Sequence, residues 1–155
     1  MHTYNVANRK LPAEILLVED NRGDAVLAAR AFSKAHIPIH LQTAESAEDA
    51  LMILHRKEEH TTSPRPDLIL LDLNLPKMHG HEFLDIIKAD DRFRHIPVII
   101  LSSSRVKQDI IRSYVHYASG YVIKPLGADQ YKDLVDAVEQ FYFKAITLPD
   151  SPDDE

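Results

Sequence analysis

Two short apolar runs that end in carboxylates are the feature that most constrains this chain. Residues 15–18 (ILLV) precede Glu19 and Asp20, and residues 68–71 (LILL) precede Asp72. Apolar runs of this length are typical of parallel strands that are buried on both faces. Open α/β sheets bind their ligands at the carboxyl ends of such strands. Three carboxylates gathered there repel one another, so either a cation neutralises them or some of their pKa values rise. A hard divalent cation is the simplest expectation.

Apolar runs and helical patterns alternate along the whole chain. This alternation predicts consecutive βαβ units around one parallel sheet, a doubly wound α/β fold. A strand order of 2-1-3-4-5 would bring the ends of the first and third strands together, although 3-2-1-4-5 is also allowed. We expect strands near residues 15–18, 39–42, 68–71, 98–101 and 121–123, and helices near residues 24–36, 47–59, 81–89, 107–117 and 128–145.

Length and composition indicate one domain. The chain has 155 residues, of which 45% are hydrophobic and 27% are charged. We expect an N-terminal extension over residues 1–12, a globular domain over residues 13–146 and an acidic tail over residues 147–155 that is disordered near its end.

Charge and hydropathy exclude several classes of protein. A net charge of −6 with scattered basic residues argues against direct nucleic-acid binding, and the lack of cysteine excludes thiolate chemistry. No apolar stretch approaches the roughly 18 residues of a membrane span, and no signal-peptide core is visible. We therefore expect a cytoplasmic protein with no membrane association.

The residues at the strand ends suit phosphoryl chemistry. Asp72 can act as a nucleophile toward phosphorus if a metal ion and fixed donors stabilise the transferred group. Mg²⁺ suits oxygen ligands such as Glu19, Asp20 and Asp72. Ser102 follows the fourth strand and Lys124 follows the fifth, so both should face the same pocket and contact phosphoryl oxygens.

Four sequence elements resemble the response-regulator receiver domain of two-component signalling, the CheY-like family. They are Glu19-Asp20-Asn21, residues 71–80 (LDLNLPKMHG), residues 97–102 (PVIILS) and residues 121–125 (YVIKP). The resemblance covers about residues 14–143, with its elements in the expected order. It implies a flavodoxin-like (βα)5 sandwich with strand order 2-1-3-4-5.

The resemblance also implies a role for each matching residue. Asp72 would be the phosphoacceptor, Glu19 and Asp20 would hold Mg²⁺, and Asn74 would add its backbone carbonyl to the metal. Lys124 would contact the phosphoryl group, with a cis peptide bond to the proline that follows.

Two further residues match the family's switch. Ser102 would hydrogen-bond the phosphoryl group once it is present, and Tyr121 would turn inward as that bond forms. Tyr121 could instead be a plain core residue of a strand that is buried on both faces. His79, where the family often has Asp, departs from the pattern, and we expect the His79-Gly80-His81 segment at the surface.

The end of the chain indicates which kinds of protein the chain would interact with. No output domain follows, so the resemblance implies a stand-alone regulator that receives phosphate from a sensor histidine kinase and acts through protein contacts or relays the phosphate to a phosphotransfer protein. Residues 141–149 (FYFKAITLP) are similar to the ends of single-domain regulators paired with bacterial phytochrome kinases.

Apolar residues near the end of the last helix suggest an interface. Phe141 and Tyr142 continue the apolar stripe of that helix, whereas Phe143, Ile146 and Leu148 extend beyond it. We favour a homodimer surface around the fourth helix, fifth strand and fifth helix. The alternative is that this segment folds back on its own domain.

Two other functions compete with the receiver. A magnesium-dependent phosphatase of the haloacid dehalogenase type also uses an Asp nucleophile at a strand end. Such enzymes usually present a second acid two residues later, where this chain has Asn74, and they carry a cap. A vestigial receiver that acts as a binding module is disfavoured by the complete set of acids with Ser102 and Lys124.

Overall fold

The central strands form one sheet because their side chains are apolar on both faces. The computed structural model describes residues 3–9 and 11–149. Its five-stranded parallel sheet has the order β3-β2-β4-β5-β6, which confirms the predicted 2-1-3-4-5 order of a flavodoxin-like sandwich. Every residue of β4 and β5 is buried, as expected for interior parallel strands. The strands are β2 (Ala13–Val18), β3 (Ile39–Ala44), β4 (Leu68–Asp72), β5 (Val98–Ser102) and β6 (Gly120–Ile123).

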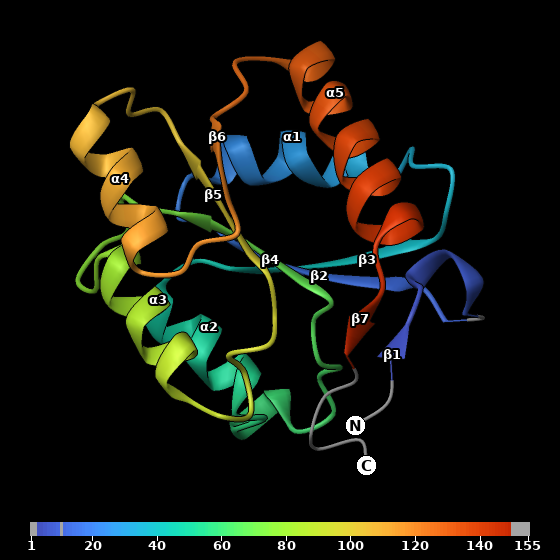
Figure 1. Cartoon of the computed structure of the whole chain (residues 1–155), viewed down its shortest axis with the longest axis horizontal. Helices are drawn as coiled ribbons and strands as arrows, with labels where there is room; N and C mark the ends of the chain where they lie inside the picture. The colour runs from blue at the N-terminus through green and yellow to red at the C-terminus, as the bar shows by residue number, and fades with distance from the viewer. Residues whose placement is uncertain (1–2, 10, 150–155) are drawn as a thin grey trace.

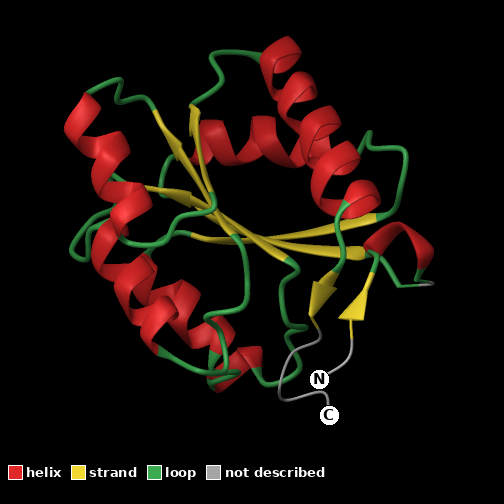
Figure 2. Cartoon of the chain, in the orientation of Figure 1, coloured by secondary structure: helices red, strands yellow, loops and turns green. Residues whose placement is uncertain are grey.

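Helices cover both faces of the sheet (Figures 1 and 2). One face carries α1 (Arg22–Phe32) and α5 (Ala128–Val138), and the other carries α2 (Ala47–Leu54), α3 (Gly80–Ala89) and α4 (Lys107–Val115). Neighbouring strand residues point to opposite faces. Leu17 belongs to the hydrophobic cluster with Phe32 of α1, whereas Leu16 belongs to the cluster with Phe83 of α3. None of the helices in the described part of the chain is long and apolar enough to cross a membrane.

The register of the strands decides which residues meet at the carboxyl edge. Val18 pairs with Leu71 and Leu71 pairs with Ile100. The three central strands therefore end level with one another, and the polar residues at their ends project from the same edge of the sheet.

Several predicted helices end earlier than expected, and two of them, α2 and α4, end next to residues with a left-handed backbone conformation. Arg56 has φ 55° and Glu58 has φ 52°, so α2 stops at Leu54 and a short 3₁₀ turn, η2 (Glu58–His60), follows. Tyr117 has φ 71° beyond the end of α4. α1 also ends at Phe32 rather than near residue 36.

The last helix changes its pitch. After α5 the chain continues as a π-helix, η3 (Glu139–Ala145). A π turn holds one more residue than an α turn, so the apolar face is rotated relative to the predicted stripe. Phe143 is fully buried and Phe141 is 56% exposed, so the prediction that Phe141 continues the buried stripe was wrong.

The segment after α5 folds back on its own domain. Phe143 and Leu148 are buried in the core and Ile146 packs against it. These three residues therefore do not extend an exposed apolar surface, and the fold-back alternative holds for them. The carboxylate of Glu139 is fully buried and anchors the segment, because it accepts the backbone N–H groups of His36 and Ile37 at 3.2 and 2.7 Å.

The two ends of the chain pair with each other (Figure 1). β1 (Thr3–Tyr4) runs antiparallel to β7 (Leu148–Pro149), and the 3₁₀ turn η1 (Val6–Asn8) follows β1. Asn5 donates its side-chain amide to the carbonyl of Lys144 at 2.7 Å. The sequence indicated neither strand, because each has two residues and no periodicity. The expected disorder near the end of the tail falls on residues 150–155, which lie outside the described residues.

Candidate functional site

The three predicted acids lie together at the carboxyl edge of the sheet. Glu19, Asp20 and Asp72 each offer a carboxylate oxygen, and these oxygens all lie within 4.8 Å of one another. Glu19 and Asp72 are buried, whereas Asp20 is exposed. Burial, together with the neighbouring carboxylate of Asp72, raises the pKa of Glu19 to about 7. The acids therefore form a cluster of two buried carboxylates and one exposed carboxylate.

Lys124 places its ammonium group among these acids. Its Nζ lies 2.5 Å from Glu19 Oε1 and 3.3 Å from Asp72 Oδ2. It also lies 2.8 Å from Oδ2 of Asp24, a residue that the sequence analysis did not include in the site. Burial alone would lower the pKa of Lys124, but the hydrogen bonds to Asp24 and Glu19 outweigh it and raise that pKa above its usual value.

The donor set fits a hard divalent cation. The ammonium group of Lys124 contacts the carboxylates of Glu19, Asp24 and Asp72. Asp20 adds a fourth carboxylate close to those of Glu19 and Asp72, so the cluster has an excess of negative charge. Carboxylate oxygens are the ligands that Mg²⁺ and Mn²⁺ prefer. Burial is the main cause of the raised pKa of Glu19, and the nearby carboxylate of Asp72 adds to it.

Asp24 enters the site because of a helix cap. Asn21 caps the N-terminus of α1 by accepting the backbone N–H of Asp24 at 2.9 Å, which orients the first turn of the helix. An acid in the first turn is ordinarily explained by the helix dipole. The sequence therefore did not distinguish Asp24 as a site residue from an ordinary first-turn acid. Its contact with Lys124 arises only when β6 and α1 come together in the fold.

The loop after β4 turns tightly against the phosphoacceptor candidate. Asn74 donates its backbone N–H to Asp72 Oδ1 at 3.1 Å, and Gly80 donates its own to the carbonyl of Leu73 at 3.0 Å. A Cβ atom on Gly80 would lie 2.8 Å from the carbonyl oxygen of Asp72 and 2.8 Å from Cα of Leu73. This close approach requires glycine.

Ser102 lies fully buried at the end of β5. Its hydroxyl accepts the backbone N–H of Ser104 at 3.1 Å, and its carbonyl accepts the backbone N–H of Lys124 at 2.8 Å. Ser102 is thereby joined to the strand end that carries Lys124.

Tyr121 is partly buried and reaches the loop after Ser102. Its side chain packs against the core on the α2–α3 face, and its hydroxyl donates to the carbonyl of Ser104 at 2.9 Å. β6 is an edge strand whose four residues are all half-buried, so the expectation of a strand buried on both faces was wrong.

Two further sequence expectations need correction. The Lys124–Pro125 peptide bond is trans, the isomer that is intrinsically favoured before proline. His81 is 2% exposed instead of lying at the surface, because the first turn of α3 packs against α4. Its Nε2 lies 2.9 Å from Oγ of Ser113, and its ring stacks on His116 with the centroids 5.5 Å apart.

Comparison with known families decides which of the competing assignments applies. The response regulator receiver domain family matches residues 15–138. The chain belongs to this family. The receiver domain assignment therefore replaces assignment to the haloacid dehalogenase type of phosphatase.

Curated relatives of this receiver domain include two regulators that match it over most of their own length. Response regulator Rcp1 of Synechocystis sp. is 36% identical over 138 residues, which cover 89% of this chain and 94% of the relative. A probable methanogenesis regulatory protein, FilR2 of Methanothrix harundinacea, is 37% identical over 131 residues, which cover 84% of each.

Solved structures give the same assignment. The phosphorylated cyanobacterial phytochrome response regulator RcpA superimposes with a TM-score of 0.84 at 37% identity, covering 90% of this chain and 100% of the other. The Mn²⁺-bound form of Rcp1 superimposes with a TM-score of 0.81 at 36% identity, with the same coverage. This receiver domain is thus a two-component response regulator whose relatives include phytochrome regulators.

Proposed function

We propose that this chain is a receiver that accepts a phosphoryl group on Asp72 from a sensor histidine kinase in the cytoplasm. The observation that carries the proposal is the position of Lys124, whose ammonium lies 3.3 Å from Asp72 Oδ2 within a cluster of carboxylates at the carboxyl edge of the sheet. A nucleophilic carboxylate beside a fixed cation is the arrangement that phosphoryl transfer needs.

In the transfer step a carboxylate oxygen of Asp72 forms a bond to phosphorus. The bond between phosphorus and the kinase imidazole breaks, and its electron pair stays on the ring nitrogen. Lys124 neutralises charge on the phosphoryl oxygens, because its ammonium group already reaches Asp72. Asn74 holds the other oxygen of Asp72 through its backbone N–H at 3.1 Å, which fixes the orientation of the carboxylate.

A divalent cation would be held by the side chains of Glu19, Asp20 and Asp72 and by the backbone carbonyl of Asn74. Bound there, Mg²⁺ supplies positive charge for the phosphoryl oxygens and orients them. The oxygen donor set supports this proposal, and so does the Mn²⁺-bound structure of the related Rcp1. The chain acts on itself in both phosphorylation and dephosphorylation, and we do not assign it an external substrate.

The response to phosphorylation would run through Ser102 and Tyr121. A phosphoryl group on Asp72 adds about two negative charges and new acceptor oxygens. The hydroxyl of Ser102 would turn from the backbone of Ser104 to the phosphoryl group, and the loop that ends at Ser104 would move with it. Tyr121 bonds the carbonyl of that same loop, so it would change its position as the loop moves.

The surface that would carry the output is formed by α4, β6 and α5. We propose homodimerisation through this surface because α4 exposes large apolar side chains there. Ile111, Tyr114 and Val115 are 50%, 50% and 66% exposed, and Tyr117 just after the helix is 74% exposed. A phosphotransfer protein, to which the chain would pass the phosphoryl group of Asp72, is an alternative partner. Sedimentation that gives monomer alone at tens of micromolar, with and without a phosphoryl donor, would reject the dimer.

The kinase partner would be of the phytochrome class. The likeness to the cyanobacterial phytochrome response regulator RcpA covers 90% of this chain, which supports this partner above an unrelated kinase. Transfer of phosphate from a phytochrome kinase to the wild-type chain, at a rate well above transfer from an unrelated histidine kinase, would test this part of the proposal.

Intact mass spectrometry tests the chemistry itself. We expect a gain of one phosphoryl group after incubation with acetyl phosphate and Mg²⁺, and no gain in the presence of chelator or in Asp72→Asn. Labelling that persists in Asp72→Asn would refute the acceptor. No gain in the wild-type chain would favour a vestigial receiver, and steady release of phosphate without accumulation would favour a hydrolase.

A further inference from the structure

A histidine and two acids meet near the C-terminal ends of α1 and α5, two helices that lie side by side (Figure 1). His36 lies in the loop between α1 and β3, Asp136 lies on α5, and Glu139 is the first residue of η3. Each offers one ligand atom, and these atoms all lie within 4.8 Å of one another. Because His36 precedes β3, the cluster is at the opposite end of the strands from Asp72, and the phosphoryl chemistry does not use it.

Glu139 is a fully buried acid that needs positive charge. Its side chain is 0% exposed, and its one side-chain partner among the described residues is the imidazole of His36. Burial raises the pKa of Glu139, but the hydrogen bonds from His36 and Ile37 and the more distant charge of Lys144 outweigh it, so the pKa lies below its ordinary value. Buried charges are ordinarily paired with an opposite charge or bound to a metal ion. His36 can supply that charge by taking up a proton or by sharing a metal ion through its ring nitrogen.

The other two side chains of the cluster face solvent and can adjust to an ion. The side chain of His36 is 76% exposed and that of Asp136 is 44% exposed. Asp136 pairs at 3.0 Å with Lys132, which lies one helical turn earlier on α5 and is 73% exposed. An exposed ion pair of this kind contributes little to stability, so an incoming cation can displace Lys132 from Asp136.

The spacing of the ligand atoms suits a tetrahedral ion. Nδ1 of His36 lies 3.1 Å from Oε1 of Glu139. Zinc bonds of about 2.0–2.1 Å place neighbouring tetrahedral ligand atoms about 3.3 Å apart. These two atoms therefore already have nearly the separation of a pair of zinc ligands. The backbone N–H groups of His36 and Ile37 also bond Glu139, and such outer partners fix the orientation of metal ligands.

We propose that His36, Asp136 and Glu139 bind a first-row transition metal ion, of which Zn²⁺ suits them best. Imidazole nitrogen suits these ions, and three protein ligands completed by water are typical of Zn²⁺ sites that are open to solvent. Mg²⁺ prefers oxygen ligands alone, so the cluster should discriminate against the ion proposed for the site at Asp72. The bound ion would join the loop before β3 to the junction of α5 and η3. Its binding would therefore raise the midpoint of thermal unfolding.

NMR of the full-length chain tests the site, because it separates this cluster from the acids at the other edge of the sheet. The ¹⁵N-labelled chain is first saturated with Mg²⁺ and then titrated with ZnCl₂. We expect Mg²⁺ to shift amides near Asp72 and to leave those of Ile37 and Glu139 unchanged. Zn²⁺ should then shift the amides of Ile37 and Glu139 saturably, and the ring ¹⁵N spectrum should show that it binds Nδ1 of His36.

Two variants identify the ligands. His36→Gln and Asp136→Asn should each weaken Zn²⁺ binding at this cluster by about tenfold or more, because even the loss of an outer partner of a metal ligand costs about 10–100-fold in affinity. Each should also lose the Zn²⁺-dependent rise in the midpoint of thermal unfolding. Both side chains are exposed, so both variants should fold, whereas Glu139 is left unchanged because it anchors η3.

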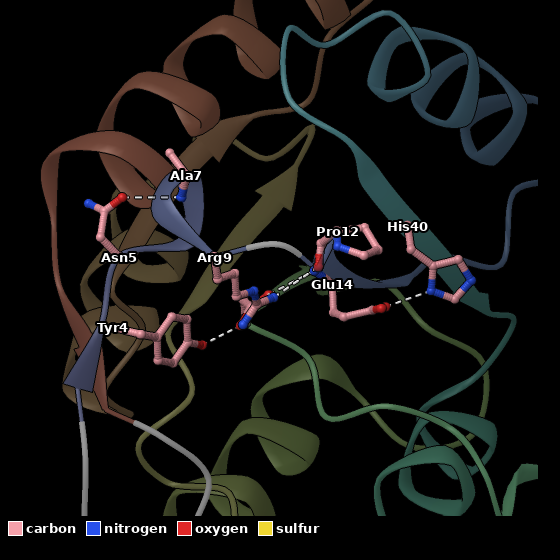
Figure 3. Close-up of polar contacts among 8 residues, drawn as sticks. Tyr4, Asn5, Ala7, Arg9, Pro12, Glu14 and His40 are labelled. Carbon is pink, nitrogen blue, oxygen red and sulfur yellow. Dashed lines mark hydrogen bonds and ion pairs between the residues drawn. The ribbon is translucent and has the colours of Figure 1, made fainter.

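His40→Gln is the matched control. His40 is 54% exposed and lies 2.6 Å from the carboxylate of Glu14 (Figure 3), but in the described part of the chain this pair belongs to no cluster of three ligands. His40→Gln should therefore leave both the Zn²⁺ affinity of the cluster and the thermal shift unchanged. Asp72→Asn should also bind Zn²⁺ here as the wild type does, so a failure of the phosphoacceptor assignment stays separate from a failure of this site.

Four outcomes would overturn the proposal. They are Zn²⁺ shifts at Ile37 and Glu139 that do not saturate, shifts of the same size with Mg²⁺ alone, equal Zn²⁺ affinity in His36→Gln and His40→Gln, and binding that is unaffected by Asp136→Asn. The last result would leave a histidine–glutamate pair without a third protein ligand, which is not the site proposed.

Discussion

Lys124 Nζ donates a hydrogen bond of 2.8 Å to the carboxylate of Asp24, which comes from the first turn of α1. The contact joins the end of β6 to the helix that follows β2. It holds the ammonium group beside the cluster of acids, where it also reaches Glu19 and Asp72. The position of the lysine therefore depends on a residue outside the motifs that identify the family.

Asp24→Asn should weaken Mg²⁺ binding about two- to fivefold. The substitution removes one negative charge near the pocket and leaves Lys124 to pair more closely with Glu19 and Asp72, which compete with the cation. Isothermal titration calorimetry measures the affinity. Asp91→Asn, at a site that is 83% exposed in the loop after α3, is the control and should not change it. Unchanged affinity in Asp24→Asn would show that this acid is not part of the electrostatic environment of the metal.

Gly80→Ala should destabilise the domain by about 2–3 kcal/mol and slow phosphorylation by acetyl phosphate. The added methyl group would lie 2.8 Å from the backbone of Asp72 and Leu73, so the loop that carries the phosphoacceptor must shift. Urea denaturation and intact mass spectrometry measure the two effects. Gly127→Ala is a matched control, because a Cβ atom there meets nothing within 4 Å. Equal effects of both substitutions would contradict the close approach at Gly80.

Phe143→Ala should lower the free energy of unfolding by about 3–5 kcal/mol, whereas Phe141→Ala should lower it by less than about 1 kcal/mol. The π-helical turn buries Phe143 completely and leaves Phe141 56% exposed. A regular α-helix would have continued the stripe through Phe141 instead. Urea denaturation of the two variants therefore tests the pitch of this segment, and the reverse order of the two effects would rule out the π turn.

His81→Gln should make the stability less sensitive to acid. Burial, helped by the nearby His79 and Arg112, lowers the pKa of His81 from its ordinary value of 6.5 to about 4. As the pH falls below 6.5 the unfolded chain takes up this proton while the folded chain does not. The corresponding stability is present above pH 6.5 and is lost progressively down to about pH 4.

The expected size of this effect is about 1.5 kcal/mol between pH 7 and pH 5. Glutamine can still donate to Ser113, whose own hydroxyl donates to the carbonyl of Asp109 at 2.8 Å. Urea denaturation at the two pH values compares the variant with the wild type, and NMR titration of the His81 ring measures its pKa directly. An equal loss of stability in both proteins, or a ring that titrates near pH 6.5, would contradict the buried environment.

The sequence alone predicted the sheet and most of the candidate site. Uninterrupted apolar runs identified the strands, and the carboxyl ends of parallel strands must lie at one edge, so the meeting of Glu19, Asp20 and Asp72 followed from the strand order. Lys124 and Ser102 followed in the same way from the strands that precede them. The structure brings Glu19, Asp20, Asp72 and Lys124 together, because their positions depend on local hydrophobicity and on the direction of the chain.

Contacts between segments that are distant in the sequence decided the features of the fold and of the site that the sequence did not predict. Asp24 has the sequence pattern of an ordinary first-turn acid, His81 that of a loop residue and Phe143 that of an exposed residue. Each owes its environment to packing: Asp24 meets Lys124, His81 meets Ser113 of α4, and Phe143 turns inward through the π-helical turn. The pairing of β1 with β7 likewise involves two-residue strands that carry no periodic signal.

The physical reason for this division is the range of the interactions. Burial of an apolar run and the alternation of strands and helices depend on residues that are close together in the chain. The sequence by itself therefore determined the fold class, the edge of the sheet that carries the acids and the residues at that edge. A buried histidine, a rotated helical face and the pairing of the two chain ends arise when segments far apart in the chain come together. The tertiary structure alone decided them, because the energy of each depends on partners that the local sequence does not specify.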